Sequence, residues 1–338
     1  MFSQGDTELP SPPSDSISCL KFSPQQNYLI AGSWDNKVRC WEITASSYSA
    51  PQGVPKAMAD YEAPILCTDW MPDCTKVMIG GCDNKAKLWD LATNQLTQIA
   101  QHNAPIKDLF WIKEKNVMVT GSWDKTLKYW DIRQQNPVFS IDLPERVYSM
   151  DVVGETLAIA TADRKAHVFN MNNPNQPFKS IESPLKYQTR CIALFTDQKG
   201  FALGSIEGRV AIQSFEENPD YTFTFKCHRD PVEKSSQKPE VAYAVNNISF
   251  AHRYTTFATA GSDGTFSFWD KDSKSRLKQF NKQPNSITSA SFNADNTLYA
   301  YGVSYDWSRG MNPSAPKDIK ICVHVVPDTE IKGKGRKK

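Results

Sequence analysis

The residues best suited to chemistry in this sequence are acids that recur after short runs of small residues. They are Asp35, Asp83, Asp124, Asp163, Glu207 and Asp263. Carboxylates could bind a metal ion or exchange protons, but an aspartate after glycine and serine also forms turns by accepting backbone hydrogen bonds. The residue six positions later is aromatic after every acid except Glu207, where it is Gln213. This regular spacing favours a structural role over catalysis.

A histidine beside such an acid could form a catalytic pair. His102 precedes the third acid, and Ser122 and Trp130 could complete a buried network with it. Cys227 and His228 are adjacent, but neighbours along a strand point to opposite faces. The sequence contains no G-x-S-x-G, P-loop, H-E-x-x-H or dinucleotide-binding motif. We therefore expect no enzyme and no cofactor, although a central channel with converging carboxylates or histidines would revive the enzyme alternative.

The acids belong to copies of one unit, which is clearest at residues 117–131. There, two β-branched and aromatic runs flank a Gly-Ser-Trp-Asp turn and end in a Trp-Asp pair. The ends of successive units are 48, 41, 39, 44 and 56 residues apart. A period of this length indicates stacked supersecondary units, and a Trp-Asp ending resembles the WD repeat, with four antiparallel strands per blade. The sequence predicts an all-β, seven-bladed WD40 β-propeller.

The domain boundaries follow from this count. We expect an arm at residues 1–14, in which a strand near Thr7 closes the last blade and so removes two open edges. The propeller spans residues 15–326, and a basic, flexible tail follows at residues 327–338, where Lys332 to Lys338 hold five basic residues in seven. Three insertions are expected in the ring. They are residues 44–60, residues 226–241 and residues 304–318.

Composition narrows the possible partners and compartments. The chain has 338 residues and a net charge of +2, so its overall charge does not indicate nucleic-acid binding. Its eight cysteines form no C-x-x-C pair or zinc spacing, which excludes a recognisable metal site and suits a reducing compartment. There is no secretory signal and no apolar run long enough to span a membrane. We expect the cytosol or the nucleus, without membrane insertion.

Two groups of residues could bind partners. Trp34 and Trp123 lie at the tips of Ser-Trp-Asp turns that open on one end of the ring, and Arg209 follows the equivalent turn of the fifth blade. Exposed Trp and Arg are typical of interface hot spots. The alternative is that each Trp packs on the loop of the next blade.

The second group combines aromatic residues with lysines. Its members are Phe225, Lys226, Trp269, Asp270, Lys271 and Lys274. Lysines beside aromatic rings can bind single-stranded nucleic acid through phosphates and base stacking. A solvated lysine face explains the same spacing equally well, and Trp269 could belong to the core.

Several motifs resemble one small WD-repeat family. They are residues 121–128, 143–146, 181–191, 204–211, 225–229 and 261–264. The family contains the nuclear-pore mRNA export factors of the Rae/Gle type and, as a sister branch, the Bub-type mitotic checkpoint propellers. The motifs at residues 201–205, 267–272 and 304–308 are similar to the export branch. This sequence departs from the family at two places. Gln213 stands where the repeat normally ends in Trp, and family members often carry Arg at the position of Ser273 or Lys274.

The resemblance implies a non-enzymatic adaptor in nuclear mRNA export. It implies docking, through Trp34, Trp123 and Arg209, on an acidic hairpin motif carried by an FG-repeat nucleoporin. It places the second group of residues on a flank that binds single-stranded RNA or messenger ribonucleoprotein. The expected location is the nucleus, at the nuclear pore complex or envelope, with shuttling to the cytoplasm. The alternative is a spindle-checkpoint scaffold that binds checkpoint proteins, including kinases.

Overall fold

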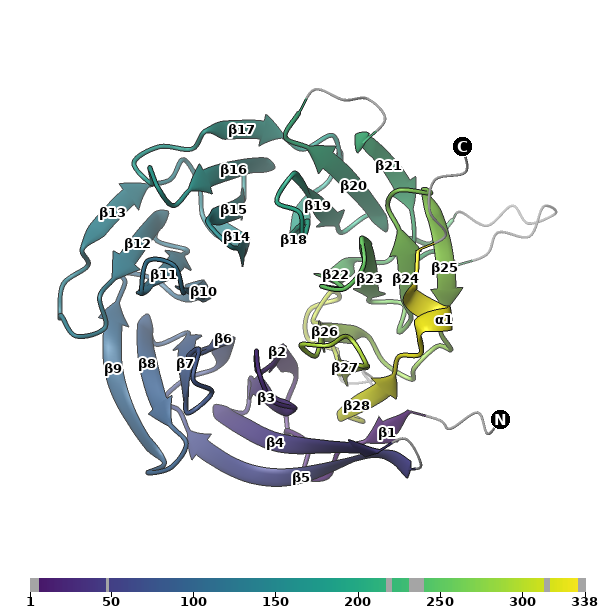
Figure 1. Cartoon of the computed structure of the whole chain (residues 1–338), viewed down its shortest axis with the longest axis horizontal. Coiled ribbons are helices and arrows are strands. Elements are labelled where there is room, and N and C mark those ends of the chain that lie inside the picture. Colours follow the sequence, from purple (N-terminus) through teal and green to yellow (C-terminus); the bar gives the residue numbers. More distant parts are fainter. Residues whose placement is uncertain (1–5, 47–48, 217–220, 231–239, 313–316, 334–338) are drawn as a thin grey trace.

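Seven four-stranded antiparallel sheets are arranged in a ring around a central axis in the computed structural model (Figure 1). The model describes residues 6–46, 49–216, 221–230, 240–312 and 317–333. The described chain is almost entirely β-structure, so the predicted seven-bladed propeller is confirmed.

Each blade takes consecutive strands, except that the last one takes its outer strand from the N-terminus. Blades 1 and 2 contain β2 (Ile17–Phe22), β3 (Tyr28–Ser33), β4 (Lys37–Ser46), β5 (Ser49–Asp60), β6 (Ile65–Trp70), β7 (Lys76–Gly81), β8 (Lys85–Asp90) and β9 (Gln95–Gln101). Blades 3 and 4 contain β10 (Ile106–Ile112), β11 (Val117–Ser122), β12 (Thr126–Trp130), β13 (Phe139–Asp142), β14 (Val147–Val153), β15 (Thr156–Thr161), β16 (Lys165–Asn170) and β17 (Lys179–Glu182).

The remaining three blades follow the same order from the innermost strand outwards. Blades 5 and 6 contain β18 (Thr189–Leu194), β19 (Gly200–Ser205), β20 (Arg209–Ser214), β21 (Phe223–Lys226), β22 (Val245–Phe250), β23 (Thr256–Gly261), β24 (Phe266–Asp270) and β25 (Ser275–Gln279). Blade 7 contains β26 (Ile287–Phe292), β27 (Leu298–Val303), β28 (Lys320–Val325) and β1 (Thr7–Glu8), and helix α1 (Asp328–Ile331) follows it.

The N-terminal strand closes the ring, as predicted. Thr7 pairs with Val323 and Glu8 with Cys322, so β1 covers the outer edge of β28. The next residue, Leu9, is 1% exposed, and its backbone N–H donates to Ile321 O at 2.8 Å. Because this pairing joins the two ends of the chain in one sheet, it protects an edge that would otherwise be open.

Two of the segments expected to lack regular structure are partly ordered. Residues 44–60 are not a loop, because β4 and β5 pair along their length from Lys37↔Asp60 to Ser46↔Ser49. The expected tail begins with helix α1, whose Ile331 is 1% exposed and packs in the core of the last two blades. Residues 334–338, which hold most of the basic charge, lie outside the described residues.

The inner strands are joined across blades by carboxylates. Asp69, Asp108 and Asp151 each accept a hydrogen bond from a backbone N–H of the next blade, at 2.7–2.9 Å. Asp69 also pairs with Lys21 at 2.8 Å. Burial raises the pKa of Asp151 to about 6. These inner acids therefore hold neighbouring blades together.

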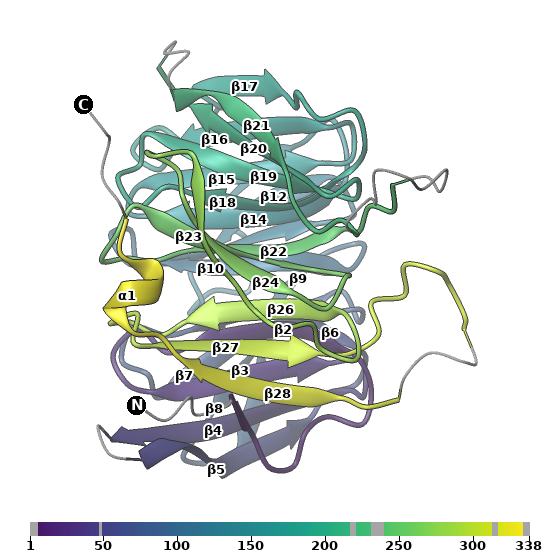
Figure 2. The same ribbon diagram turned by 90° about the vertical axis from the view of Figure 1, so that its right-hand side faces the viewer.

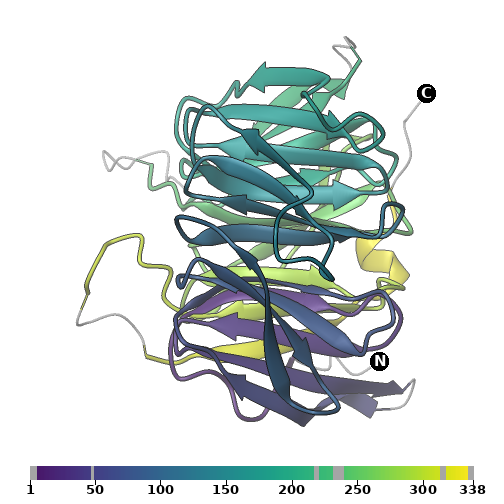
Figure 3. The same ribbon diagram turned by 90° about the vertical axis from the view of Figure 1, so that its left-hand side faces the viewer.

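The two ends of the ring differ in their connections. The loop between β27 and β28 projects from one end, and helix α1 lies at the other (Figure 2). On the opposite side of the ring, the blue and teal blades are joined by shorter connections (Figure 3). We call the end with the β27–β28 loop the top face, because the turn between the second and third strands of every blade opens there. Among the described residues, no helix is long and apolar enough to cross a membrane.

Candidate partner-binding surfaces

The turn acids shape the hairpins of the top face. The carboxylates of Asp35, Asp83, Asp124 and Asp263 each accept a hydrogen bond from the backbone N–H two residues further on, at 3.0–3.1 Å. This is the geometry of an Asx turn, in which the side chain stabilises its own loop. The turn role expected from the sequence is therefore present in these four blades.

In blade 3 the acid anchors a buried network. His102 contacts the Asp124 carboxylate through Nδ1 at 2.9 Å and the Thr120 hydroxyl through Nε2 at 2.7 Å. The indole N–H of Trp130 donates to the same Thr120 oxygen at 2.8 Å. Ser122, which the sequence also placed in this network, accepts from the Asp124 backbone N–H at 3.0 Å but does not contact His102, because its hydroxyl donates to the Ala104 and Pro105 carbonyls.

Blade 6 contains a second copy of this network, which the sequence analysis missed. His228 contacts Asp263 at 2.9 Å and Thr259 at 2.9 Å, and the Trp269 indole donates to Thr259 at 2.9 Å. His228 lies at the start of an insertion, between β21 and β22, and stands next to Cys227, where the sequence drew attention only to an improbable nucleophile. The signal that could have found it is the Thr-x-x-x-Asp spacing that precedes both acids.

Each network links a carboxylate, an imidazole and a hydroxyl in the same sequence as a hydrolase triad. Unlike the nucleophile of such a triad, the hydroxyl is buried. Thr120 and Thr259 are both 0% exposed, and His102 is 1% exposed. A substrate carbonyl cannot reach either hydroxyl without unfolding the blade. Burial lowers the pKa of His102 despite its hydrogen bond to Asp124, which favours the neutral imidazole. Hydrogen bonds from His102 and Thr126 outweigh burial and hold the pKa of Asp124 well below its usual range.

One position in the top-face turns is built alike in all seven blades. In each blade, the residue directly after the second strand donates its backbone N–H to a carbonyl of the loop that enters the same blade. These residues are Trp34, Cys82, Trp123, Ala162, Ile206, Ser262 and Ser304. Large apolar side chains stand in blades 1, 3 and 5, and small ones stand in blades 2, 4, 6 and 7. We call the large three the tip residues.

The side chains of the tip residues are only partly buried by the rest of the protein. Trp34 and Ile206 are each 42% exposed. Trp123 is half-buried, and its indole N–H is buried without a hydrogen-bond partner among the described residues. Buried donors are normally paired, so an unpaired indole N–H is an unusual feature of this turn. Ile206 is the tip residue that the sequence analysis did not select, although its turn was aligned with the others.

Cations also lie at the top-face ends of blades 4 and 5. Arg209 begins β20, its side chain is 34% exposed, and its Nε lies 3.7 Å from Glu207. Arg146 is 53% exposed and only loosely paired with Glu145, at 3.8 Å. Arg190, at the inner edge of blade 5, is also exposed. The top face thus combines large apolar side chains with weakly paired guanidinium groups, which suits an acidic partner with apolar anchors.

The flank residues separate into two places along the junction of blades 5 and 6. In the upper half, the Phe225 and Trp269 rings lie 4.6 Å apart, and the Arg276 guanidinium lies 5.8 Å from the Trp269 ring. Lys226 is exposed and pairs with Glu240 at 3.1 Å. Trp269 and Lys226 line a groove of about 450 Å³. Trp269 is therefore both a member of the blade 6 network and partly accessible.

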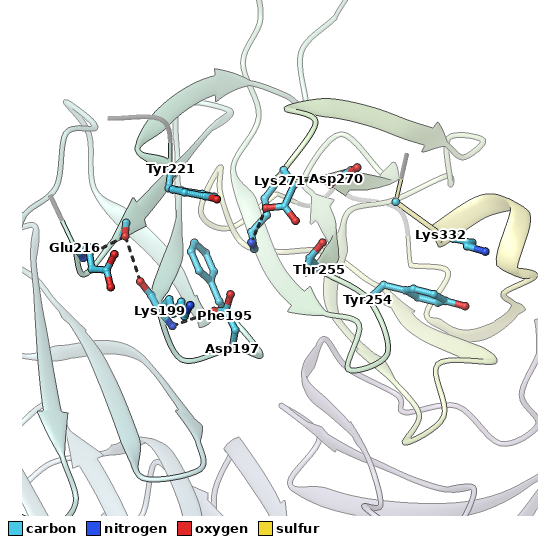
Figure 4. Close-up of a pocket in the computed structure, with 13 residues that line it drawn as sticks. Phe195, Asp197, Lys199, Glu216, Tyr221, Tyr254, Thr255, Asp270, Lys271 and Lys332 are labelled. Carbon is cyan, nitrogen blue, oxygen red and sulfur yellow. Dashed lines mark hydrogen bonds and ion pairs between the residues drawn. The ribbon is translucent and has the colours of Figure 1, made fainter. Parts of the chain in front are cut away.

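The lower half of the flank opens into a cavity of about 640 Å³ at the end opposite the top face (Figure 4). Lys271 is 7% exposed, its Nζ pairs with Asp272 at 2.9 Å, and it lies 5.1 Å from the Phe195 ring. Asp270 is 2% exposed and accepts from Ser273, so it forms the turn. Lys274 is exposed and lies over Phe223.

No group of three or more His, Cys, Asp or Glu side chains is arranged to hold a metal ion in the described part of the chain. The cysteines are all free, and burial raises the pKa of several of them, including Cys40 to about 12. A buried thiol with a raised pKa is a poor nucleophile and a poor ligand. The accessible chemistry of the molecule lies in its aromatic and basic surface residues.

Comparison with known proteins agrees with this picture. The family model of the WD domain, G-beta repeat, matches residues 7–42, 56–90, 93–131 and 220–270. The Poly(A)+ RNA export protein of Schizosaccharomyces pombe is 45% identical over 337 residues, which cover 98% of this chain and 94% of that protein. Protein RAE1 of Arabidopsis thaliana is 48% identical, with 97% and 93% covered. An mRNA export factor of Danio rerio is 49% identical, with 90% and 84% covered.

This chain belongs to the Rae1/Gle2 family of WD-repeat mRNA export factors. The similarity extends over nearly the full chain, so it includes both the top face and the flank. In this Rae1/Gle2 protein, the residues chosen from the sequence fall into the two surfaces described above. The top face holds Trp34, Trp123 and Arg209, and the junction of blades 5 and 6 holds the other six.

Proposed function

We propose that this protein is a non-enzymatic adaptor in nuclear mRNA export. Its top face docks on an acidic hairpin motif of an FG-repeat nucleoporin, and it works at the nuclear pore complex, with passage between nucleus and cytoplasm. The observation that carries the docking proposal is the pattern of tip residues. Three large apolar side chains on alternate blades, beside the weakly paired Arg209, form one broad recognition surface. Its similarity to a Poly(A)+ RNA export protein and to an mRNA export factor supports a role in mRNA export.

The flank between blades 5 and 6 contributes single-stranded RNA binding. Phe225 and Trp269 supply aromatic faces for bases, while the exposed Lys226 and Lys274 supply cations for phosphates. Lys271 is 7% exposed and paired with Asp272, so it reaches a phosphate only where that ion pair opens. Asp270 shapes the turn that carries Lys271 and Lys274, and its own charge is buried. The two halves of this flank lie one after the other along the junction of blades 5 and 6. A single strand of RNA that follows this junction would therefore pass both of them.

The decisive experiment is a charge reversal at the top face. We expect Arg209→Glu to weaken binding of a synthetic acidic nucleoporin hairpin by about 100-fold, because a hydrogen-bonded interfacial charge is commonly worth 2–5 kcal/mol. Isothermal titration calorimetry measures the affinity, and thermal unfolding checks that the ring is intact. The matched control is Arg133→Glu, a cation at the opposite end of blade 3. An unchanged affinity in Arg209→Glu would refute the top-face assignment.

A pull-down from nuclear extract separates this function from the checkpoint alternative. We expect the wild-type protein to retain FG-repeat nucleoporins and Arg209→Glu to lose them. Enrichment of checkpoint kinases in place of nucleoporins would contradict the export function and favour the scaffold of the mitotic spindle checkpoint.

A further inference from the structure

His324 joins the two ends of the chain at the last blade. It lies near the end of β28, with its side chain 13% exposed. Its Nδ1 contacts the Asp6 carboxylate at 2.6 Å, and its Nε2 contacts the Glu330 carboxylate at 2.9 Å. Asp6 directly precedes the closing strand β1, and Glu330 lies in helix α1. One imidazole therefore bridges the N-terminal strand and the C-terminal helix.

This geometry requires a protonated ring. A carboxylate oxygen can only accept hydrogen bonds, so both ring nitrogens must carry a proton to satisfy both contacts, and only imidazolium does so. A neutral imidazole has one N–H and one lone pair, so it must leave one of the two carboxylates facing an acceptor. Burial by itself would lower the pKa of His324, but the hydrogen bonds to Asp6 and Glu330 outweigh it and leave the pKa raised.

The other groups around the ring reinforce the pairing. The Tyr301 hydroxyl, on β27, donates to Asp6 at 2.5 Å, and Lys278, on β25, pairs with Glu330. The Phe280 ring lies 4.7 Å from the imidazole in an edge-on arrangement, and Phe266 lies 5.9 Å away. The only charged groups that contact His324 in the described structure are thus the two carboxylates. Aromatic walls keep much of the water away and strengthen both ion pairs.

We propose that His324 is a pH-sensitive clasp that holds helix α1 and the N-terminal strand to the last blade. The clasp is closed while His324 is charged. Its stabilising effect is fully present below the ordinary histidine pKa and is lost as the pH rises through the raised pKa of the folded protein. When the ring loses its proton, either Asp6 or Glu330 loses its hydrogen bond from His324 and keeps only its contact with Tyr301 or Lys278, so the segment that carries it loosens.

The clasp holds a segment that forms part of the wall of the lower flank cavity. Lys332 and Gly333, which follow α1 directly, line the same cavity as Asp270 and Lys271. In Figure 4, α1 and Lys332 lie on the side of the cavity opposite Glu216. Release of α1 therefore removes one wall of this cavity. The consequence for RNA rests on the proposed function, whereas the clasp itself concerns only the protein's own ends.

Hydrogen exchange of the free protein tests the clasp. We measure amide protection in residues 326–333 at about pH 6 and about pH 8, corrected for intrinsic exchange, on either side of the ordinary histidine pKa. We expect protection to fall by about tenfold at the higher pH, the size of effect expected for loss of one hydrogen bond to a charged group. In His324→Gln, protection should be low at both pH values. In His167→Gln, a histidine of blade 4, the pH dependence should be retained.

A proton titration by NMR gives the second readout. We expect the pKa of His324 to exceed that of an exposed histidine and to fall in Glu330→Gln, which keeps the shape of α1 while removing one charge. A pKa at or below the ordinary value, or protection in residues 326–333 that does not change with pH in the wild type, would overturn the proposal. Because no RNA or nucleoporin is present, failure here is separate from failure of the proposed function.

Discussion

Blades 3 and 6 build the same buried network beneath different turn tips. In both, a histidine joins a turn aspartate to a threonine, and a tryptophan donates to that threonine, with all six distances between 2.7 and 2.9 Å. Blade 3 presents Trp123 at its tip. Blade 6 presents Ser262, whose hydroxyl is used within the protein by Asp306 of the β27–β28 loop. The network therefore does not determine what the tip does.

The tryptophans below the tips differ in the same way. Trp130 is 1% exposed in blade 3, whereas Trp269 in blade 6 is partly accessible and packs against Phe225. Blade 3 thus leaves an aromatic side chain partly accessible at its tip, and blade 6 leaves one partly accessible at its outer side. A shared network that stabilises each blade lets the ring vary its surface residues independently, which is how a repeated scaffold acquires separate binding surfaces.

The largest expected effect tests whether the two networks are structural. We expect Asp124→Ala and Asp263→Ala each to lower the free energy of unfolding by about 3 kcal/mol, because a buried histidine loses its charged partner. Urea unfolding followed by tryptophan fluorescence measures this. Asp60→Ala is the control, since Asp60 is 80% exposed in its pair with Lys37 and should change stability by less than about 0.5 kcal/mol. Losses no greater than this control would show that the networks do not hold the blades.

The next effect separates the tip of blade 3 from its network. We expect Trp123→Ala to weaken binding of the acidic hairpin by about 30-fold, in the range of an interface hot spot, while leaving the unfolding midpoint nearly unchanged. Calorimetry and urea unfolding are run on the same samples. Phe178→Ala is the matched control, because Phe178 is 53% exposed but lies away from the top-face turns. A loss of stability without a loss of affinity would make Trp123 a packing residue.

Blade 3 was easier to predict from sequence than blade 6, for a physical reason. His102 and Asp124 are 22 residues apart, within one regular repeat, whereas His228 and Asp263 are 35 residues apart because an insertion intervenes. The hydroxyl that contacts the histidine in blade 3 was not predicted, because Thr120 and Ser122 lie on the same face of β11, two residues apart. Only the packing of the neighbouring loop decides which of them meets the histidine.

The blades themselves were predictable, but their outer strands were not. The three inner strands of each blade are apolar because they pack on neighbouring blades, and the closing strand follows from the need to cover an edge. The outer strands, such as β13 and β17, alternate between half-buried and exposed residues and carry few apolar side chains. The same limit applies to the flank, where spacing could not reveal that Asp270 and Lys271 are buried while Lys274 is exposed.

A smaller effect tests the outer side of blade 6 as an RNA surface. We expect Lys271→Glu with Lys274→Glu to weaken binding of a single-stranded oligonucleotide by about tenfold and to flatten its salt dependence, with a slope change of about 0.7 per lost phosphate contact. Fluorescence anisotropy at several salt concentrations measures both quantities. The control replaces Lys56 and Lys76, on blades 1 and 2, by glutamate. An unchanged slope would place RNA elsewhere on the molecule.

The smallest expected effect is a difference in the pH dependence of stability between a turn acid, Asp124, and an inner-strand acid, Asp151. The pKa of Asp124 is held low, so its stabilising effect is present above the ordinary aspartate pKa and is lost as the pH falls. Asp151 behaves in the opposite way. Its pKa is raised to about 6, mainly by burial, so the folded state binds its proton more tightly than the unfolded state does, and stability falls as the pH rises from the ordinary value towards about 6.

We therefore expect Asp151→Asn to raise the free energy of unfolding by about 1 kcal/mol at neutral pH, since the neutral amide oxygen still accepts from the Leu194 N–H without a buried charge. The gain should disappear at acidic pH, where Asp151 is already protonated in the folded protein. Urea unfolding at several pH values measures this, and Asp124→Asn should show the reverse dependence. A gain that is independent of pH would show that packing, rather than the buried charge, sets the effect, and the contrast between the two kinds of acid would be lost.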